Sequence, residues 1–353
     1  MYDIHKYLIY HTIFNMNYIE VQQNAKKIME PRCHVCKECN GVACRGELPG
    51  SGGKGSGNGF IRAYEKLSDI KVNMDTIYEN KGQDTSFCLF GHTFSGPVFP
   101  APVSGMSWNY TGYFTEETYS KALVEGTLAA GTIAFTGDGV DSSYYEGPLV
   151  SVKEAKGFGI PTIKPWDFDT IASKIKVAER INVFAIAMDI DSAGLPLITS
   201  AGNPLEIKSV EQLTKIRELI HIPFIIKGIM TVEGAKKAFK AGADAIIISN
   251  HGGRVLDCTP APIEVLPEIR KAVGDSKVIF IDGAIRSGMD IFKSIAMGAN
   301  AVLIGRPYVI AVHGGGAEGV EIFTKKYLAE LSDVMKMTDC TTLSDIDFSK
   351  IYK

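Results

Sequence analysis

The chain has 353 residues, of which 45% are hydrophobic and 22% are charged, and its formal net charge is −3. This composition excludes a disordered or fibrous protein, and the small negative charge argues against a nucleic acid or an anionic membrane surface as a partner. The length allows two domains or one α/β barrel.

The first residues contain an apolar stretch over 7–14, which is short, includes His11 and lacks a small-residue cleavage site. We therefore expect neither a signal peptide nor a membrane span. Seven cysteines, an odd number, in a chain without a secretion signal indicate a reducing compartment. The sequence predicts a cytoplasmic protein.

Four of the cysteines lie close together, at Cys33, Cys36, Cys39 and Cys44. Thiols at this density can bind zinc or an iron–sulfur cluster. The spacing departs from the bacterial ferredoxin run, because the last gap is four residues and Arg45 follows in place of proline. Free structural thiols are the alternative, and the two interpretations have equal support.

The next segment, Pro49–Gly59, is rich in glycine. Such a composition is typical of a flexible linker, which we prefer to a loop shaped by a ligand. The matches to Gly-x-Gly-x-x-Gly at Gly50–Gly55 and Gly314–Gly319 lack a strand–turn–helix setting, so we expect neither to bind a dinucleotide.

From residue 97 onward, short apolar runs alternate with stretches of helical spacing. The predicted strands are 98–103, 132–136, 161–164, 184–189, 224–227, 245–250, 278–282 and 301–304. The predicted helices include Glu116–Ala130, Phe168–Ile181, Val210–Ile220, Val232–Lys240, Ile263–Val273 and Asp290–Met297. This order predicts a parallel (β/α)8 TIM barrel over 97–340 after an N-terminal extension over 1–96, with an open doubly wound sheet as the alternative.

Polar residues follow the later strands, at the end where barrel enzymes build their active sites. Lys227 ends the fifth strand, and Ser249-Asn-His-Gly-Gly-Arg254 follows the sixth. His251 suits a general base near neutral pH, and Arg254 offers a fork for a carboxylate. A lysine reaching solvent and a histidine capping a glycine turn are the structural alternatives.

Two loops that combine glycine with arginine follow the seventh and eighth strands. They are Asp282–Arg286 and Gly305–Arg306. Loops in this position of a barrel commonly bind phosphate through backbone amides and a helix start. We predict phosphate binding here, with pairing of the arginines to surface acids as the alternative.

The segment Ser249–Asp257, followed by Pro260–Pro267, resembles the signature of FMN-dependent 2-hydroxy-acid oxidases and dehydrogenases such as glycolate oxidase and lactate oxidase. The resemblance extends to Ile226–Gly228, Asp282–Lys293 and Gly305–Pro307. It implies a (β/α)8 barrel, FMN, a homo-oligomer such as a tetramer, and oxidation of a small L-2-hydroxy acid to the 2-oxo acid. An FMN enzyme resembling type 2 isopentenyl diphosphate isomerase is the alternative, and a non-catalytic flavin- or metal-binding protein is a third.

The resemblance also implies roles for single residues. His251 would take the hydroxyl proton while hydride leaves C2 for flavin N5, Asp189 would stabilise the protonated imidazole, and Arg254 would hold the substrate carboxylate. Lys227 would lie by the flavin N1–C2 carbonyl, where reduction builds negative charge. The implied contacts to the isoalloxazine are Pro102, Val103, Ser104 and Ser249, and those to the ribityl phosphate are Asp282, Gly283, Ala284, Ile285, Arg286, Gly305 and Arg306.

Three positions on the substrate side depart from the family pattern. The family's tyrosine in a Gln-x-Tyr setting meets Pro161–Ile163, its arginine after the fourth strand meets Leu195, and its N-terminal tyrosine is replaced by the Pro49–Gly59 run. Lys164 is a candidate for part of the missing positive charge. A substrate or electron acceptor other than the family's therefore stays open.

Overall fold

The computed structural model describes residues 16–195 and 205–352; the apolar stretch 7–14 lies outside them. Its centre is a parallel sheet of eight strands, hydrogen-bonded in the order β3-β10-β9-β8-β7-β6-β5-β4. The strands are β3 (Val98–Pro100), β4 (Phe135–Thr136), β5 (Ile160–Ile163), β6 (Ile186–Asp189), β7 (Phe224–Ile229), β8 (Ala245–Ile248), β9 (Val278–Ile281) and β10 (Ala301–Ile304). Because the last strand, β10, pairs with the first, β3, the sheet curls into a nearly closed barrel. The predicted barrel is confirmed and the open doubly wound sheet is wrong.

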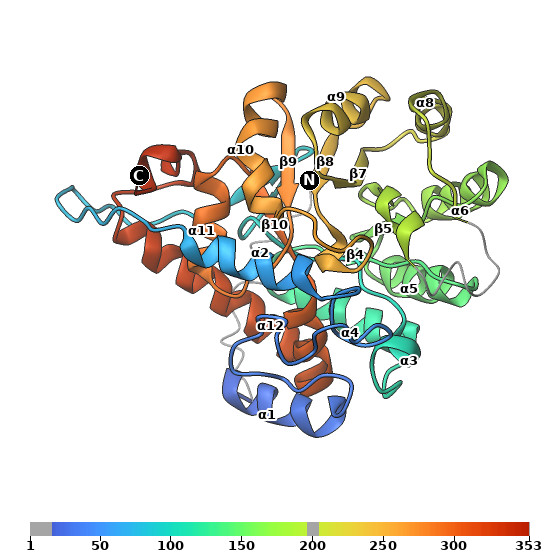
Figure 1. Cartoon of the computed structure of the whole chain (residues 1–353), viewed down its shortest axis with the longest axis horizontal. Coiled ribbons are helices and arrows are strands. Elements are labelled where there is room, and N and C mark those ends of the chain that lie inside the picture. Colours follow the sequence, from blue (N-terminus) through green and yellow to red (C-terminus); the bar gives the residue numbers. More distant parts are fainter. Residues whose placement is uncertain (1–15, 196–204, 353) are drawn as a thin grey trace.

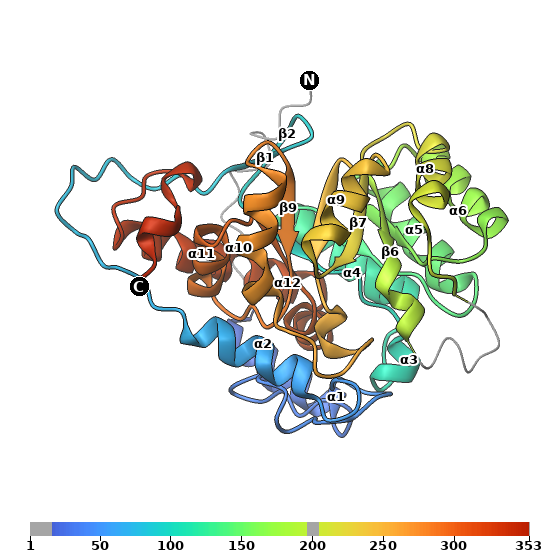
Figure 2. The ribbon, with the colours of Figure 1, turned by 45° about the horizontal axis from the view of Figure 1, so that its top comes forward.

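Helices surround this sheet, as Figure 1 and Figure 2 show. They are α4 (Glu116–Ala129), α5 (Ser143–Glu154), α6 (Phe168–Arg180), α8 (Val210–Glu218), α9 (Val232–Lys240), α10 (Pro262–Val273), α11 (Gly288–Ala296) and α12 (Arg306–Lys336). The Ser209 side chain accepts from the backbone N–H of Gln212, whose side chain accepts in return from the backbone N–H of Ser209. This capping box fixes the start of α8.

Aromatic side chains fill the barrel interior and close one of its ends. The rings of Phe99, Phe135 and Phe280 meet edge to face, with centroids 5.8 to 6.4 Å apart. The hairpin of β1 (Phe87–Leu89) and β2 (His92–Phe94) places Phe94 against Phe99, at 5.5 Å between centroids. The residues that begin the barrel strands belong to the same apolar cluster as this hairpin. The hairpin therefore seals the amino-terminal end of the barrel and leaves the carboxyl end open for a site.

The part of the chain before the barrel packs against it. Helix α1 (Tyr18–Met29) buries its apolar face on α12, where a side-chain carbon at Gly314 would lie 1.9 Å from the Val21 carbonyl oxygen. Helix α2 (Asn58–Asp69) lies at the end of the barrel opposite the hairpin (Figure 2), beside the short helix η3 (His251–Gly253). The division into two domains at residue 97 stays a prediction.

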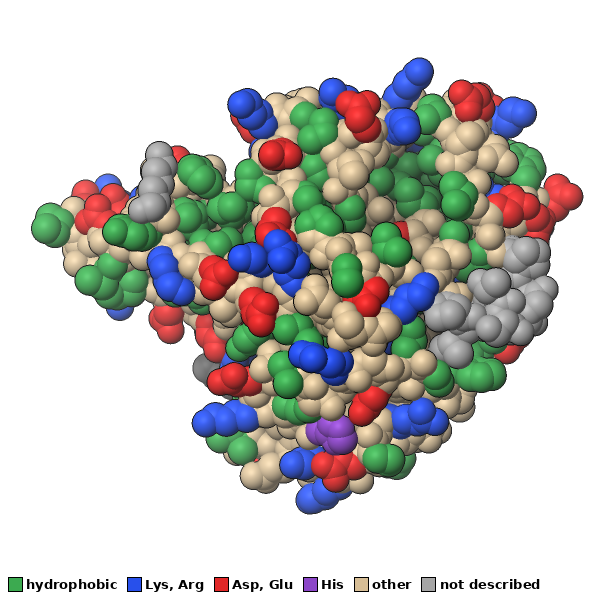
Figure 3. Space-filling model, viewed as in Figure 1, with side chains coloured by type: hydrophobic (Ala, Val, Ile, Leu, Met, Phe, Trp, Pro, Cys, Tyr) green, Lys and Arg blue, Asp and Glu red, His purple; other side chains and the backbone are tan. Residues whose placement is uncertain are grey.

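The remaining elements are the short helices α3 (Met106–Asn109), η2 (Ile190–Gly194), η4 (Leu343–Asp345) and η5 (Phe348–Lys350). None of the helices within the described ranges is both long and apolar enough to span a bilayer. On the face seen in Figure 3, basic and acidic side chains are interspersed.

Candidate active site

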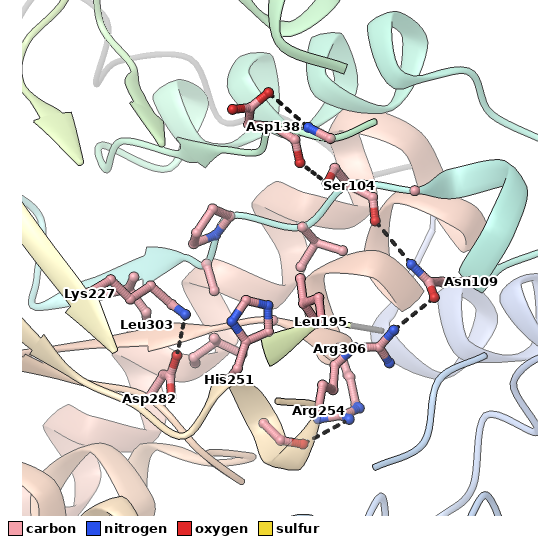
Figure 4. Close-up of a pocket in the computed structure, with 18 of the residues that line it drawn as sticks. Ser104, Asn109, Asp138, Leu195, Lys227, His251, Arg254, Asp282, Leu303 and Arg306 are labelled. Atoms are coloured by element: carbon pink, nitrogen blue, oxygen red, sulfur yellow. Dashed lines mark hydrogen bonds and ion pairs between the residues drawn. The ribbon is translucent and has the colours of Figure 1, made fainter. Parts of the chain in front are cut away.

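A pocket opens at the carboxyl ends of the barrel strands. Its walls come from β7 and from the segments after β3, β4, β5, β6, β8, β9 and β10. Its charged lining includes Lys164, Lys227, His251, Arg254, Asp282 and Arg306. Figure 4 shows the His251 ring between the Lys227–Asp282 pair on one side and the two arginines on the other. The residues predicted from strand ends therefore meet in one place.

Asp189, the last residue of β6, is a buried carboxylate between two lysines. Its Oδ1 lies 2.9 Å from Nζ of Lys227, and its Oδ2 lies 3.5 Å from Nζ of Lys164. Burial alone would raise the pKa of Asp189, but His251 and the two ammonium groups hold it well below its usual value. Asp189 is therefore an anion that keeps Lys227 charged.

His251 lies beside two carboxylates, and we call His251, Asp189 and Asp191 the base cluster. Its Nδ1 is 3.2 Å from Asp191 Oδ1 and 3.5 Å from Asp189 Oδ1. Burial opposes a charged imidazole, yet the two carboxylates raise the pKa of His251 above its ordinary value. The implied contact with Asp189 is present, but Asp191 is the nearer partner, and our sequence reasoning missed it.

The backbone turn after β8 aims the imidazole into the pocket. His251 has a φ of 58°, an uncommon value for a residue with a side chain, and Gly252 and Gly253 follow at 62° and 78°. The backbone N–H of His251 donates to Ser249 Oγ at 3.0 Å, and that hydroxyl donates to Asp282 Oδ2 at 2.7 Å. Ser249 is buried and holds this turn instead of lining the pocket.

Arg254 is largely engaged by the protein itself. Its Nη1 donates to the carbonyl oxygens of Gly50 at 2.7 Å and Gly52 at 3.1 Å, and its Nη2 donates to Asn109 Oδ1 at 2.7 Å. Burial and the neighbouring Arg306 lower the pKa of Arg254 to about 10, so it remains charged at neutral pH. Three of the five N–H donors of a guanidinium are thus directed to protein acceptors.

The Pro49–Gly59 run packs against Arg254 and Arg306, two arginines that line the pocket, so the expectation of a flexible linker is wrong. Ser51 is 3% exposed, and its carbonyl oxygen accepts from Arg306 Nε at 2.6 Å. A side-chain carbon at Gly52 would lie 1.9 Å from the Cys44 carbonyl oxygen. The glycines let backbones approach closely and expose their carbonyl groups to the arginines, which a linker composition does not reveal.

Comparison with known proteins agrees with this geometry. The sequence model of a family described as FMN-dependent dehydrogenase matches residues 200–353. The chain is 30% identical over 305 residues to an L-lactate oxidase of Lactobacillus jensenii, covering 78% of this chain and 73% of the relative. It is 44% identical over 292 residues to a 2-hydroxyacid oxidase of Dictyostelium discoideum, covering 82% of this chain and 71% of the relative.

The chain belongs to the FMN-dependent dehydrogenase family. A crystal structure of mandelate oxidase has the same fold, with a TM-score of 0.79 at 23% identity over 95% of this chain and 97% of that one.

FMN is the cofactor of an FMN-dependent dehydrogenase, and the pocket residues fit it. The segments implied to hold FMN, 102–104, 283–286 and 305–306, all line the pocket. Within the described residues, neither Nη1 of Arg306 nor Nη2 of Arg286 has a hydrogen-bond acceptor, and the buried Asp282 Oδ1 has no partner. A side-chain carbon at Gly305 would meet only Val103 and Ala101, at the ordinary contact distances of 3.7 and 3.8 Å, so the backbone here is open to a ligand. These groups suit a phosphorylated ligand with hydrogen-bonding ring atoms.

The cysteine cluster is not gathered around one point. All four thiols are half-buried and unpaired by disulfides: Cys33, Cys36, Cys39 and Cys44. Over 16–195 and 205–352, the base cluster is the one set of three possible metal ligands whose atoms lie within 4.8 Å of one another. Burial raises the pKa of Cys33 to about 11, which keeps it a thiol at neutral pH. The cysteine loop instead contacts a residue that lines the pocket, because Arg286 Nε donates to the Cys39 carbonyl oxygen at 3.0 Å.

The structure adds pocket residues that sequence reasoning did not single out. Trp108, Asn109, Tyr110 and Tyr144 line the pocket from the segments after β3 and β4. Asp138, after β4, is buried and accepts from the backbone N–H of Lys164 at 3.0 Å. An Asp-x-Asp pattern at the end of β6 was the one available signal for Asp191.

Proposed function

We propose that this protein oxidises a small L-2-hydroxy acid to the 2-oxo acid with FMN, using His251 as the base. One observation carries the proposal: an imidazole held by two carboxylates lies in the same pocket as Arg254 and Lys227. Two relatives that the chain covers well are named L-lactate oxidase and 2-hydroxyacid oxidase, which supports the same substrate class.

In this proposal each residue has a distinct task. Nδ1 of His251 faces the carboxylates and carries a hydrogen, so Nε2 takes the proton of the substrate hydroxyl. Asp189 and Asp191 then stabilise the protonated imidazole. Bound FMN would supply the acceptor for the hydride that leaves C2. Lys227, kept charged by Asp189, supplies a fixed positive charge at the cofactor.

The experiment is anaerobic mixing of the FMN-loaded protein with L-lactate, glycolate and longer 2-hydroxy acids, followed by flavin absorbance. We expect bleaching by at least one acid, and H251A should retain FMN while reduction slows by a factor of about 100 or more. H221A is the matched control, because this histidine is exposed and pairs with Glu179 outside the pocket. Failure of every hydroxy acid would contradict the substrate class and leave the isomerase alternative, and unchanged reduction in H251A would remove the base.

Three further expectations from the sequence belong to this proposal. We propose a homo-oligomer, and light scattering coupled to gel filtration tests it. We also propose a cytoplasmic location, and cell fractionation tests it.

Zinc or iron–sulfur binding at the cysteines also stays a prediction. Metal analysis of protein purified without air decides it, and a metal-free protein with full FMN content would contradict it.

A further inference from the structure

Lys164 is a buried cation in the pocket, and its ion pair with Asp189 is long, at 3.5 Å. It follows β5 directly, lines the pocket and is 6% exposed. Among the residues that the structure describes, its charged partner is Asp189, at 3.5 Å, whereas Lys227 contacts the other oxygen of that carboxylate at 2.9 Å. An ammonium has three donors, and leaving them unsatisfied in a buried place is costly. Lys164 therefore has donors available for a ligand.

The position of Lys164 is fixed by Asp138. One oxygen of this buried carboxylate accepts from the backbone N–H of Lys164 at 3.0 Å and from the indole of Trp166 at 2.6 Å, and the other accepts from Lys174 at 3.0 Å. The backbone carbonyl of Asp138 accepts from Ser104 at 2.7 Å. Asp138 thus fixes the position of Lys164 relative to the loop after β3, on which FMN is expected.

Arg254 has few donors left for a substrate carboxylate. Three of its donors serve Gly50, Gly52 and Asn109, and two donors remain for a group with about four acceptor sites. Leu195, at the position of the family's second arginine, has no side-chain donor. A second cation in the pocket would therefore complete the recognition of an acid substrate.

We propose that Lys164 is a second substrate-binding residue, whose ammonium binds one carboxylate oxygen of the substrate while Arg254 binds the other. This inference rests on the proposed function. It assigns the recognition of the acid group to a lysine held by Asp138 and Asp189, and it predicts discrimination against neutral esters and amides of the same hydroxy acid, because they offer no charge to the ammonium.

The test is a titration of the FMN-loaded protein with oxalate, a compact dicarboxylate, followed by the change in flavin absorbance. In K164M the dissociation constant should rise roughly tenfold or more, whereas K164R, which keeps a cation, should recover most of the affinity. K176M, which removes an exposed lysine of α6, is the control and should bind as the original protein does. Equal flavin spectra and melting temperatures show that the variants fold.

A dissociation constant in K164M within about twofold of the original would overturn the inference. K164Q keeps the polarity without the charge and should also lose affinity, which provides a second test if K164M does not fold. Oxalate binding that depends on Lys164, in a protein that no hydroxy acid reduces, would refute the proposed substrate class but support the role of the lysine. Reduction by hydroxy acids with no dependence on Lys164 would do the reverse.

Discussion

Asp191 is the residue whose replacement tests the base cluster most directly. Its Oδ1 lies 3.2 Å from Nδ1 of His251. Coulomb's law gives the attraction between a protonated imidazole and a carboxylate at this distance as about 1 kcal/mol at the dielectric constant of water and about 5 kcal/mol at an effective value of 20. Since one pKa unit corresponds to about 1.4 kcal/mol, D191N should lower the pKa of His251 by about one unit or more.

The sign of the effect on the reaction follows from the role of the base. His251 accepts a proton only when it is neutral, so reduction of FMN falls as pH drops through its pKa, which the carboxylates place above the ordinary value. In D191N the acid limb of the pH–rate profile, where the rate falls, should move to lower pH. The rate on the plateau above this limb should also be smaller, because a weaker base takes the proton less readily. Asparagine keeps an acceptor for Nδ1–H, so the orientation of the ring is retained.

The assay is anaerobic stopped-flow reduction of the FMN-loaded protein by its hydroxy acid from pH 5 to 9, analysed as the second-order rate constant. D169N, which removes an exposed acid in the first turn of α6, controls for total charge and should leave the limb in place. An unchanged limb in D191N, or one displaced to higher pH, would refute the assignment of Asp191 as the partner of the base.

Two other variants test the packing that supports the pocket. G52A should lower the free energy of unfolding by about 1 to 3 kcal/mol and weaken FMN retention, because the added carbon meets the Cys44 carbonyl at 1.9 Å; urea unfolding measures the first and flavin release the second. G147A, whose added carbon lies 3.5 Å from its neighbour, is the control, and equal stability of the two would contradict the close packing of this run. D138N should cost about 3 kcal/mol or more in urea unfolding, because it leaves the partly buried Lys174 ammonium without its anion. A loss below about 1 kcal/mol would show that Asp138 does not hold the loop after β5.

Much of the barrel follows from local sequence pattern. The eight apolar runs predicted as strands each overlap one strand of the barrel, and the helix Val232–Lys240 has the predicted bounds. Buried parallel strands are apolar on both faces, so they are visible without knowledge of their partners. Lys227 was found because it ends a predicted strand, and His251 because it directly follows one.

The sequence by itself determined the barrel, the FMN family and the set of residues at the strand ends, because these depend on short-range periodicity and on a contiguous motif. Only the tertiary structure decided which groups meet. The approach of Asp191 to His251 joins residues 60 positions apart, and Arg254 reaches the Gly50 carbonyl across 204. Such contacts arise from the curvature of the sheet and from close backbone packing of glycines, which leave no local signal. For the same reason, a run with the composition of a linker packs against the arginines that line the pocket.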